Sequence, residues 1–322
     1  MNNVTYRYIM ASLKEVGEKN IIQNILNIIR PCSQLGPGDD AAIASADDGK
    51  VVICTDVVTF DRHFPKGMTY EHFGWTAAAV NFSDIASMGA KPTGFLAALA
   101  LPEDMDENDL YDIMSGIDQC AEFCGTTILG GDTKFGPGLI AGTAIGSLEG
   151  RKPLTRSGAK PGDVIAVTGC LGAAAAGFFA IENDISDKDS IFSLMVPIPR
   201  VEEGLALSKS NAVTACMDLS DGLAEAAKSI CKASHVGMDI QMDFIPEGEG
   251  VKDICKILDM DKKDLTLYWG GDYELLFTFK KEQIDSLYKA GLVFSIIGIV
   301  TNDDCPYIIE GNERTRMKDG RY

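Results

Sequence analysis

The sequence predicts an α+β protein of two domains that contains much antiparallel sheet. Strand-like and helix-like segments mix without a strict βαβ rhythm, which disfavours a doubly wound fold. The length of 322 residues suits one large domain or two ordinary ones. A polar, basic stretch with two prolines at 150–162 interrupts the pattern, and it predicts a junction between domains at 1–149 and 150–322.

The first domain should open with a short amphipathic helix at 21–29, which Pro31 would end. A β-branched run then predicts a buried strand, and a stretch of small residues predicts a helix that packs closely on a sheet. The remaining elements follow the same logic. In order, we expect a strand at 51–58, a helix at 70–88, a strand at 94–101, a helix at 106–124, and strands at 126–129 and 139–148.

The second domain should begin with a strand at 164–168 and a helix at 171–181. Four more β-branched or apolar runs predict strands with helices between them. They lie at 213–217, 238–242, 274–279 and 293–300.

Composition narrows the class of protein. The apolar share of 46% and the charged share of 24% are typical of a soluble globular protein. A net charge of −18 argues against nucleic acid or an anionic membrane as a partner. Anionic substrates remain possible, because bound cations can reverse the local sign of charge.

Nine cysteines, an odd number without a Cys-x-x-Cys pair, predict reduced and mostly buried thiols and therefore a cytoplasmic location. The first twenty residues carry charges and no apolar core, so no signal peptide is expected. The longest apolar stretch, near 173–181, is too short to span a bilayer.

Seven aspartates fall in five short motifs with Gly, Ser, Thr or Asn. Carboxylates with such neighbours are poor acid–base groups but good ligands for hard cations, which prefer oxygen donors. Three scattered histidines do not suit a zinc site. The motifs therefore predict a Mg²⁺-dependent enzyme that handles phosphate; they are Gly36-Pro-Gly-Asp-Asp40, Cys54-Thr-Asp56, Asn81-Phe-Ser-Asp84, Gly130-Gly-Asp-Thr133 and Asp218-Leu-Ser-Asp-Gly222.

Other interpretations of these motifs stay open. The loop at 36–41 formally fits a dinucleotide fingerprint, but no strand precedes it and its carboxylates would face the pyrophosphate. It could also be a surface turn. Ser83-Asp84 and Ser220-Asp221 could be helix N-caps. No P-loop lysine motif is present, so Arg156 is the candidate for a basic phosphate contact, unless it is an exposed charge of the linker.

Together the motifs resemble the thiamine-monophosphate kinase family, in the superfamily of aminoimidazole ribonucleotide synthetase. The resemblance spans roughly residues 36–280, and its most specific blocks are 80–92 and 155–163. It implies a two-domain architecture like that of the synthetase: an N-terminal α/β domain with a mixed sheet that binds ATP and Mg²⁺ and forms a homodimer, and a C-terminal α+β domain that completes the active site. It also implies transfer of the γ-phosphoryl group of ATP to thiamine monophosphate, assisted by several Mg²⁺ ions.

The resemblance also implies residue roles, none of them a catalytic acid or base. The implied metal ligands are Asp40, Thr55, Asp56, Asp84, Asp132, Asp218 and Asp221. The implied ATP contacts are Gly131, Asp132, Arg156 and Ser220, and the implied substrate contacts are His63 and Tyr322.

This chain departs from the family pattern at three places. Cys54 stands where many members have Ser or Thr as a metal ligand, and Gly271 stands where many have Glu. The usual aromatic motif near the C-terminus is missing, which leaves only Tyr322 as a substitute. The alternatives are a selenophosphate synthetase-like or hydrogenase-maturation dehydratase-like enzyme, and a nucleotide-binding regulator without catalysis.

Overall fold

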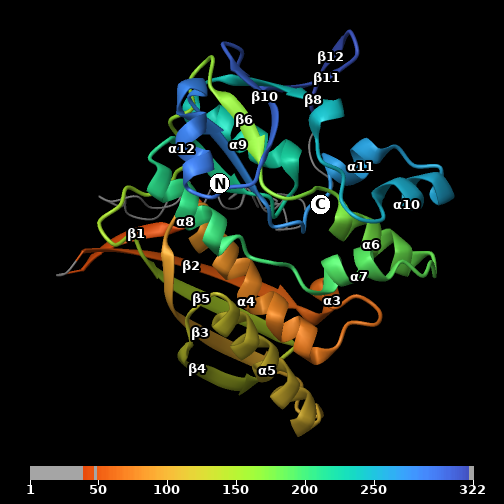
Figure 1. Cartoon of the computed structure of the whole chain (residues 1–322). Helices are drawn as coiled ribbons and strands as arrows, with labels where there is room; N and C mark the ends of the chain where they lie inside the picture. Colours follow the sequence, from red (N-terminus) through yellow and green to blue (C-terminus); the bar gives the residue numbers. More distant parts are fainter. Residues whose placement is uncertain (1–38, 47–48, 319–322) are drawn as a thin grey trace, which may run out of the picture.

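The computed structural model describes residues 39–46 and 49–318 (Figure 1). The helix expected at 21–29 and the candidate substrate residue Tyr322 lie outside the described residues.

The N-terminal half is a five-stranded mixed sheet in the order β1-β2-β5-β3-β4. All neighbours are antiparallel except β3 and β4. The strands predicted in this half are all present, whereas β1 was not predicted. The bounds are β1 Ala42–Ala46, β2 Gly49–Thr59, β3 Lys91–Leu101, β4 Ile128–Phe135 and β5 Leu139–Ser147.

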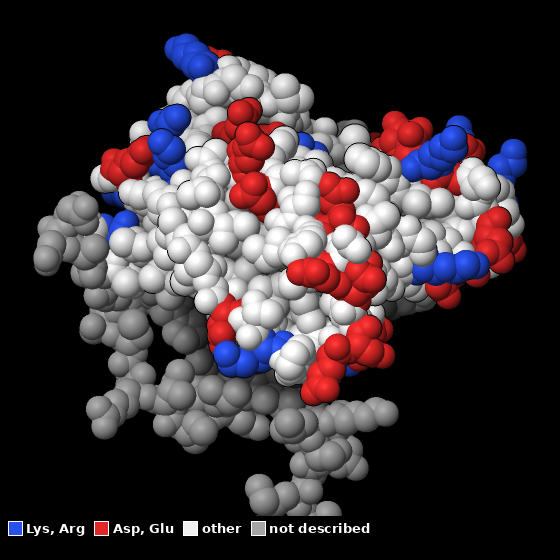
Figure 2. All heavy atoms as spheres, turned by 90° about the horizontal axis from the view of Figure 1, so that it is seen from below, with Lys and Arg blue, Asp and Glu red and all other residues white. Residues whose placement is uncertain are grey.

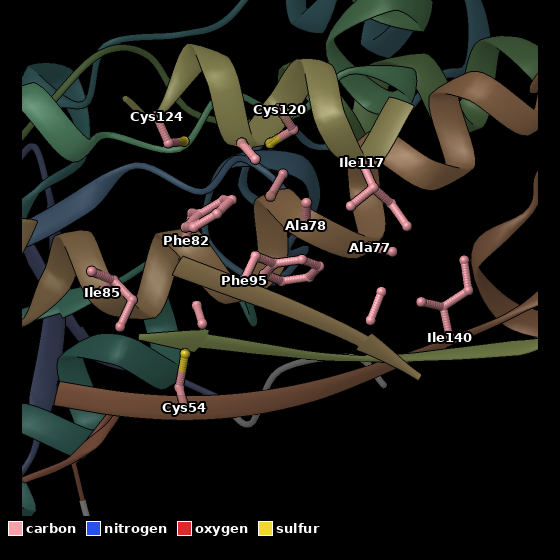
Figure 3. Packing of buried hydrophobic residues seen from close by; sticks show 14 of the residues in the cluster. Cys54, Ala77, Ala78, Phe82, Ile85, Phe95, Ile117, Cys120, Cys124 and Ile140 are labelled. Atoms are coloured by element: carbon pink, nitrogen blue, oxygen red, sulfur yellow. The ribbon is translucent and has the colours of Figure 1, made fainter. Parts of the chain in front are cut away.

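Two predicted helices, α4 (Tyr70–Ser87) and α5 (Glu107–Phe123), build the core of this half. Helix α4 lies on the sheet and α5 lies on α4, as Figure 3 shows. Phe82 of α4 and Phe95 of β3 are fully buried between α4 and the sheet, with ring centroids 5.4 Å apart. The short α3 (Phe60–His63) follows β2 directly.

Glycine permits the close crossing of α4 and α5. A Cβ atom on Gly74 would lie 1.9 Å from the carbonyl oxygen of Ile113, and one on Gly116 would lie 1.9 Å from that of Glu71. Backbone therefore touches backbone at this crossing, which requires a glycine at both positions.

The C-terminal half is a seven-stranded sheet in the order β12-β11-β8-β10-β6-β9-β7, in which β11 and β8 are the one parallel pair. All the predicted strands occur; β11 and β12 were missed. The strands are β6 Val164–Val167, β7 Val213–Asp218, β8 Gly237–Gln241, β9 Leu275–Phe279, β10 Ser295–Thr301, β11 Pro306–Glu310 and β12 Glu313–Arg316. The helices are α6 Ala173–Glu182, α7 Lys188–Met195, α8 Val201–Ser210, α9 Leu223–Ser234, α10 Val251–Leu258, α11 Lys262–Thr266 and α12 Ile284–Lys289.

Both faces of this second sheet are covered. Leu276 of β9 packs in the cluster that contains α9, while its neighbour Phe277 packs with Leu207 of α8 and Leu287 of α12. This alternation follows from the two-residue period of a strand. Two mixed sheets with helices confirm the predicted α+β class, and none of the described helices is long and apolar enough to cross a bilayer.

The glycine contacts at the α4–α5 crossing predict the effect of a single methyl group. Gly116→Ala should lower the free energy of unfolding by about 1–3 kcal/mol, because the helices must separate to admit the new Cβ. Asp118→Ala, on the exposed side of the same helix, should change it by less than about 0.5 kcal/mol. Urea denaturation measures both, and equal midpoints for the two variants would contradict the close crossing.

Candidate active site

A cleft of about 1150 Å³ opens where the two halves meet. Its walls come from both halves: the end of β2, α3 and α4 on one side, and the end of β7, α6, α9 and the loop before β9 on the other. Of the residues predicted from the sequence, the cleft gathers Asp40, Thr55, Asp56, His63, Asp84, Arg156, Asp218, Ser220 and Asp221.

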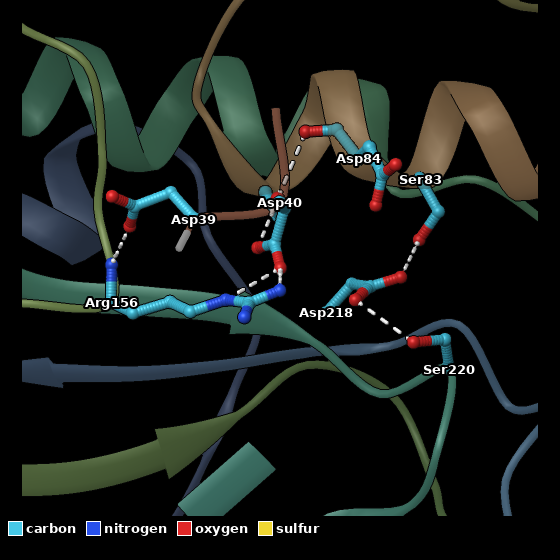
Figure 4. A network of polar contacts seen from close by, with 8 residues as sticks. Asp39, Asp40, Ser83, Asp84, Arg156, Asp218 and Ser220 are labelled. Carbon is cyan, nitrogen blue, oxygen red and sulfur yellow. Dashed lines mark hydrogen bonds and ion pairs between the residues drawn. The ribbon is translucent and has the colours of Figure 1, made fainter. Parts of the chain in front are cut away.

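Three carboxylates form the centre of the cleft (Figure 4). Asp40, Asp84 and Asp218 each offer one oxygen atom, and these atoms lie within 4.8 Å of one another. Asp40 and Asp84 belong to the N-terminal half, whereas Asp218 ends β7 of the C-terminal half. An all-oxygen donor set of this kind fits a hard divalent cation such as Mg²⁺.

Burial and the negative charge of neighbouring carboxylates disfavour the ionised forms of Asp218 and Asp84. Burial raises the pKa of Asp218 to about 7, and the charge of Asp40 adds to the effect. Burial also raises the pKa of Asp84 well above its ordinary value, with further contributions from Asp218, Asp40 and Asp56. Asp56 lines the cleft. Burial by the cleft walls raises its pKa, and the charge of Asp221 adds to this rise. A bound cation would remove this penalty.

Arg156 is the basic group of this cluster. Its Nε donates to Asp40 Oδ1 at 2.9 Å, its Nη2 contacts the same oxygen, and its backbone N–H donates to Asp39 Oδ1 at 2.7 Å. Ser87 Oγ donates to the other oxygen of Asp40 at 2.6 Å. Arg156 is therefore not an exposed charge of the linker, and Asp39 anchors the junction beside Asp40.

Two serines donate hydrogen bonds to Asp218, and the one from Ser83 joins the two halves. Ser83 Oγ donates to its Oδ2 at 2.7 Å, and Ser220 Oγ donates to its Oδ1 at 3.2 Å. The N-cap interpretation of both serine–aspartate pairs is wrong. Ser83 lies inside α4, and the N-cap residue of α9 is Gly222.

Thr55 and Asp56 point to opposite faces of β2, as consecutive strand residues must. Thr55 Oγ1 donates to the carbonyl oxygen of Gly142 at 2.6 Å. The thiol of Cys54 is buried and donates to the carbonyl oxygen of Asn81 at 3.1 Å. Burial raises its pKa well above the ordinary value, so Cys54 stays a neutral thiol and is a poor ligand for a hard cation.

Gly131 and Asp132 do not line the cleft of their own chain. The sequence predicted that they follow a strand ending at residue 129, but they lie inside β4, which pairs with β3. A Cβ atom on Gly131 would lie 1.8 Å from the carbonyl oxygen of Ala97, so the close approach of β3 requires this glycine. Asp132 is exposed and pairs with Lys134 at 3.0 Å, which lowers its pKa.

His63 ends α3 and lines the cleft. Its Nδ1 accepts a hydrogen bond from the backbone N–H of Thr59 at 3.1 Å. Burial lowers the pKa of His63, so the ring is neutral near pH 7 and Nε2 carries the proton.

Sequence reasoning missed the wall of the cleft formed by Phe178 and Glu182 of α6 and by Trp269. The loop that carries Trp269 is held by buried carboxylates. Asp272 accepts hydrogen bonds from the backbone N–H groups of Gly172 and Ala174 at 2.7 and 3.2 Å, and Glu274 pairs with Arg200 through both carboxylate oxygens. The position of Trp269 beside a Gly-Gly-Asp motif was the one signal that could have pointed to it.

Comparison with known proteins identifies the class. The family model "AIR synthase related protein, N-terminal domain" matches residues 38–148, and the corresponding C-terminal model matches residues 160–309. The chain belongs to this family. Within it, the chain groups with the thiamine-monophosphate kinases, which confirms the resemblance found in the sequence.

The similarity extends over most of the chain. A thiamine-monophosphate kinase of Methanospirillum hungatei is 39% identical over 82% of this chain and 88% of the relative. That of Methanopyrus kandleri is 35% identical, with coverage of 90% and 92%. A solved structure described as "AaThiL complexed with AMPPCP and TMP" has a TM-score of 0.85 at 27% identity and covers 96% of this chain and 98% of its own. Hydrogenase maturation protein HypE, at 20% identity and a TM-score of 0.72, shares the fold.

The crowded carboxylates predict how stability depends on pH and metal. The folded protein keeps the proton of Asp218 up to about pH 7, whereas the unfolded chain loses it near 3.8. The contribution of Asp218 to the free energy of unfolding is thus greatest below pH 3.8, and it is lost as the pH rises towards 7. In metal-free protein at pH 7, Asp218→Asn should raise Tm, while Mg²⁺ should raise Tm more in the wild type than in this variant.

Thermal melts with EDTA and with Mg²⁺ at several pH values test this prediction. Asp112→Asn, an exposed change on α5, is the matched control and should respond to Mg²⁺ as the wild type does. An equal Mg²⁺-induced rise in Tm for Asp218→Asn and the wild type would show that the cluster does not bind the cation.

Proposed function

We propose that the protein transfers the γ-phosphoryl group of ATP to thiamine monophosphate and forms thiamine diphosphate. The observation that carries the proposal is the convergence of three carboxylates from two halves beside Arg156, in a chain similar to thiamine-monophosphate kinases. Curated relatives bear the name thiamine-monophosphate kinase, and the solved relative held AMPPCP, an ATP analogue, together with TMP.

The reaction depends more on screening the negative charge of the two substrates than on acid–base catalysis. The acceptor is already a phosphate and is nucleophilic without a base, so the main obstacle is repulsion between two polyanions. Asp40, Asp84 and Asp218, with Asp56 and Asp221 beside them, would hold Mg²⁺. Bound there, Mg²⁺ would supply the positive charge that screens the repulsion and stabilises an in-line transition state.

Groups on either side of the carboxylates would position the two substrates. Arg156 adds a fixed positive charge for the phosphates of ATP, and the hydroxyl group of Ser220 lies next to Asp218. His63 also lines the cleft, where a neutral ring that donates from Nε2 suits contact with the acceptor. Reaction in line requires donor and acceptor phosphates to meet between these groups.

We also propose that the protein forms a homodimer. The outer face of the N-terminal sheet exposes apolar side chains on several strands, among them Val57 of β2, Leu96 of β3 and Leu129 of β4. Such a patch is typical of a surface that another copy covers. Because Gly131 and Asp132 lie outside their own cleft, their expected role with ATP and metal requires that a second copy present them.

The partners are small molecules. The face drawn in Figure 2 carries clusters of acidic side chains and only scattered basic ones. With a net charge of −18, this surface does not favour binding to nucleic acid.

The direct test incubates purified protein with Mg²⁺-ATP and thiamine monophosphate and measures thiamine diphosphate, with free thiamine as a control acceptor. Asp84→Ala should lower kcat by about a hundredfold or more, because it removes a central ligand, while the fold stays intact. Asp118→Ala should leave the rate unchanged. Normal turnover by Asp84→Ala would refute the metal scheme, and ATP binding without transfer would favour a non-catalytic regulator.

Mixing two inactive variants tests the shared site. If Asp132 serves the partner's cleft, then a dimer of one Asp132→Ala chain and one Asp84→Ala chain contains one complete site. Random exchange of subunits should thus restore about a quarter of wild-type activity. No recovery after verified exchange would show that Asp132 acts within its own chain or has no role.

A further inference from the structure

The cleft has an aromatic wall that none of the roles above uses. Phe178 and Trp269 both line the cleft, with ring centroids 4.8 Å apart and planes inclined by 36°. Phe179 packs against both rings, 5.0 Å from Trp269 and 5.6 Å from Phe178. The two lining side chains, Phe178 and Trp269, are partly exposed, and Phe179 supports them from behind within the packed cluster.

The wall is fixed close to the carboxylates. Gly271 N–H donates to the carbonyl oxygen of Ser220 at 2.9 Å, and a Cβ atom on Gly270 would lie 1.9 Å from that oxygen. The loop of Trp269 therefore lies directly on the segment that joins Asp218 to Asp221. Asp272, which caps α6, ties the same loop to the helix of Phe178.

A carboxylate accompanies the rings. Glu182 follows Phe178 by four residues on α6, lines the same cleft and is exposed. Within the described residues it forms no ion pair or side-chain hydrogen bond. Asp61, Arg62 and His63 of α3 line the same cleft, and the ion pair of Lys66 with Asp184 at 2.9 Å joins the segment after α3 to the segment after α6.

We propose that Phe178, Trp269 and Glu182 bind the ring system of the acceptor and thereby determine acceptor specificity. Exposed ring faces beside a carboxylate favour a flat aromatic cation, through stacking and cation–π attraction. The thiazolium ring of thiamine carries a permanent positive charge, and its aminopyrimidine ring is flat. This assignment rests on the proposed function, in which the phosphate of the same molecule reaches the carboxylates next to the wall.

Fluorescence tests ring binding without any phosphoryl transfer. The chain contains two tryptophans, and Trp75 is not among the residues that line the cleft; its Nε1 donates to the carbonyl oxygen of the lining residue Pro197 at 2.7 Å. Free thiamine, which has no phosphate, should quench wild-type fluorescence to saturation. The quenching should persist in Trp75→Phe and vanish in Trp269→Phe. Absence of saturable quenching in the wild type would overturn the assignment.

Kinetics test the same residues during turnover. Trp269→Ala and Phe178→Ala should each raise KM for thiamine monophosphate about tenfold or more, with kcat and KM for ATP much less affected. Glu182→Gln should raise the same KM by a smaller factor. Phe192→Ala, an exposed aromatic change on α7 outside the cleft, is the matched control. It should leave kcat and both KM values unchanged.

The outcomes separate this assignment from the proposed function. Wild-type transfer with an unchanged KM in both Trp269→Ala and Phe178→Ala would overturn the aromatic wall and leave the kinase function standing. Saturable quenching by thiamine without any transfer would support the wall and reject the kinase function. Should Trp269→Ala fail to fold, the quenching experiment and the KM of Phe178→Ala decide the question.

Discussion

The structure depends on one constraint: three acidic side chains from two halves must share a partly buried space. Mutual repulsion of Asp40, Asp84 and Asp218 opposes the packing of the halves. The hydrogen bonds from Ser83, Ser87 and Ser220 and the ion pair with Arg156 hold the carboxylates in place against it. The crowded carboxylates thus lower the stability of the metal-free protein, and the proposed binding of divalent cations would offset that loss, which is a common relation between strain and function.

Helix α4 links this constraint to the rest of the fold. One side lies on the N-terminal sheet, and Gly74 lets α5 approach within backbone contact. Near its C-terminus the helix also meets the second half, where a Cβ atom on Gly204 of α8 would lie 2.1 Å from Ala86 O. Ser83 and Asp84 lie in that stretch. A helix packed so closely against several elements has little freedom to move, so it presents Asp84 to Asp218 in a fixed position.

Local sequence predicted the regular elements well, because β-branched runs and amphipathic spacing act over a few residues. It failed where the outcome depends on distant pairing. The Gly130-Gly131 pair looked like the end of a strand, but pairing with β3 extends β4 through it. The cluster of carboxylates was predictable from residue type, whereas the exclusion of Asp132 was not, because spacing along the chain does not reveal that β4 is an edge strand. Trp269 was missed because its contact with Phe178 depends on Asp272 capping a helix 100 residues earlier in the sequence.

The loop from Trp269 to Glu274 links the proposed ring-binding wall to the carboxylate cluster. Gly270 and Gly271 contact Ser220, which lies between Asp218 and Asp221, and Trp269 packs against Phe178 in the wall proposed to bind the acceptor rings. Movement of the wall therefore moves a neighbour of Asp218. An acceptor whose rings pack against Trp269 would hold this loop in place and, through it, the segment that bears Asp218 and Asp221. Binding energy from the non-reacting rings would then serve to orient the reacting phosphate, as expected when remote contacts contribute to catalysis. A small phosphate without rings could occupy the same carboxylate site, but it would lack that orientation and react slowly.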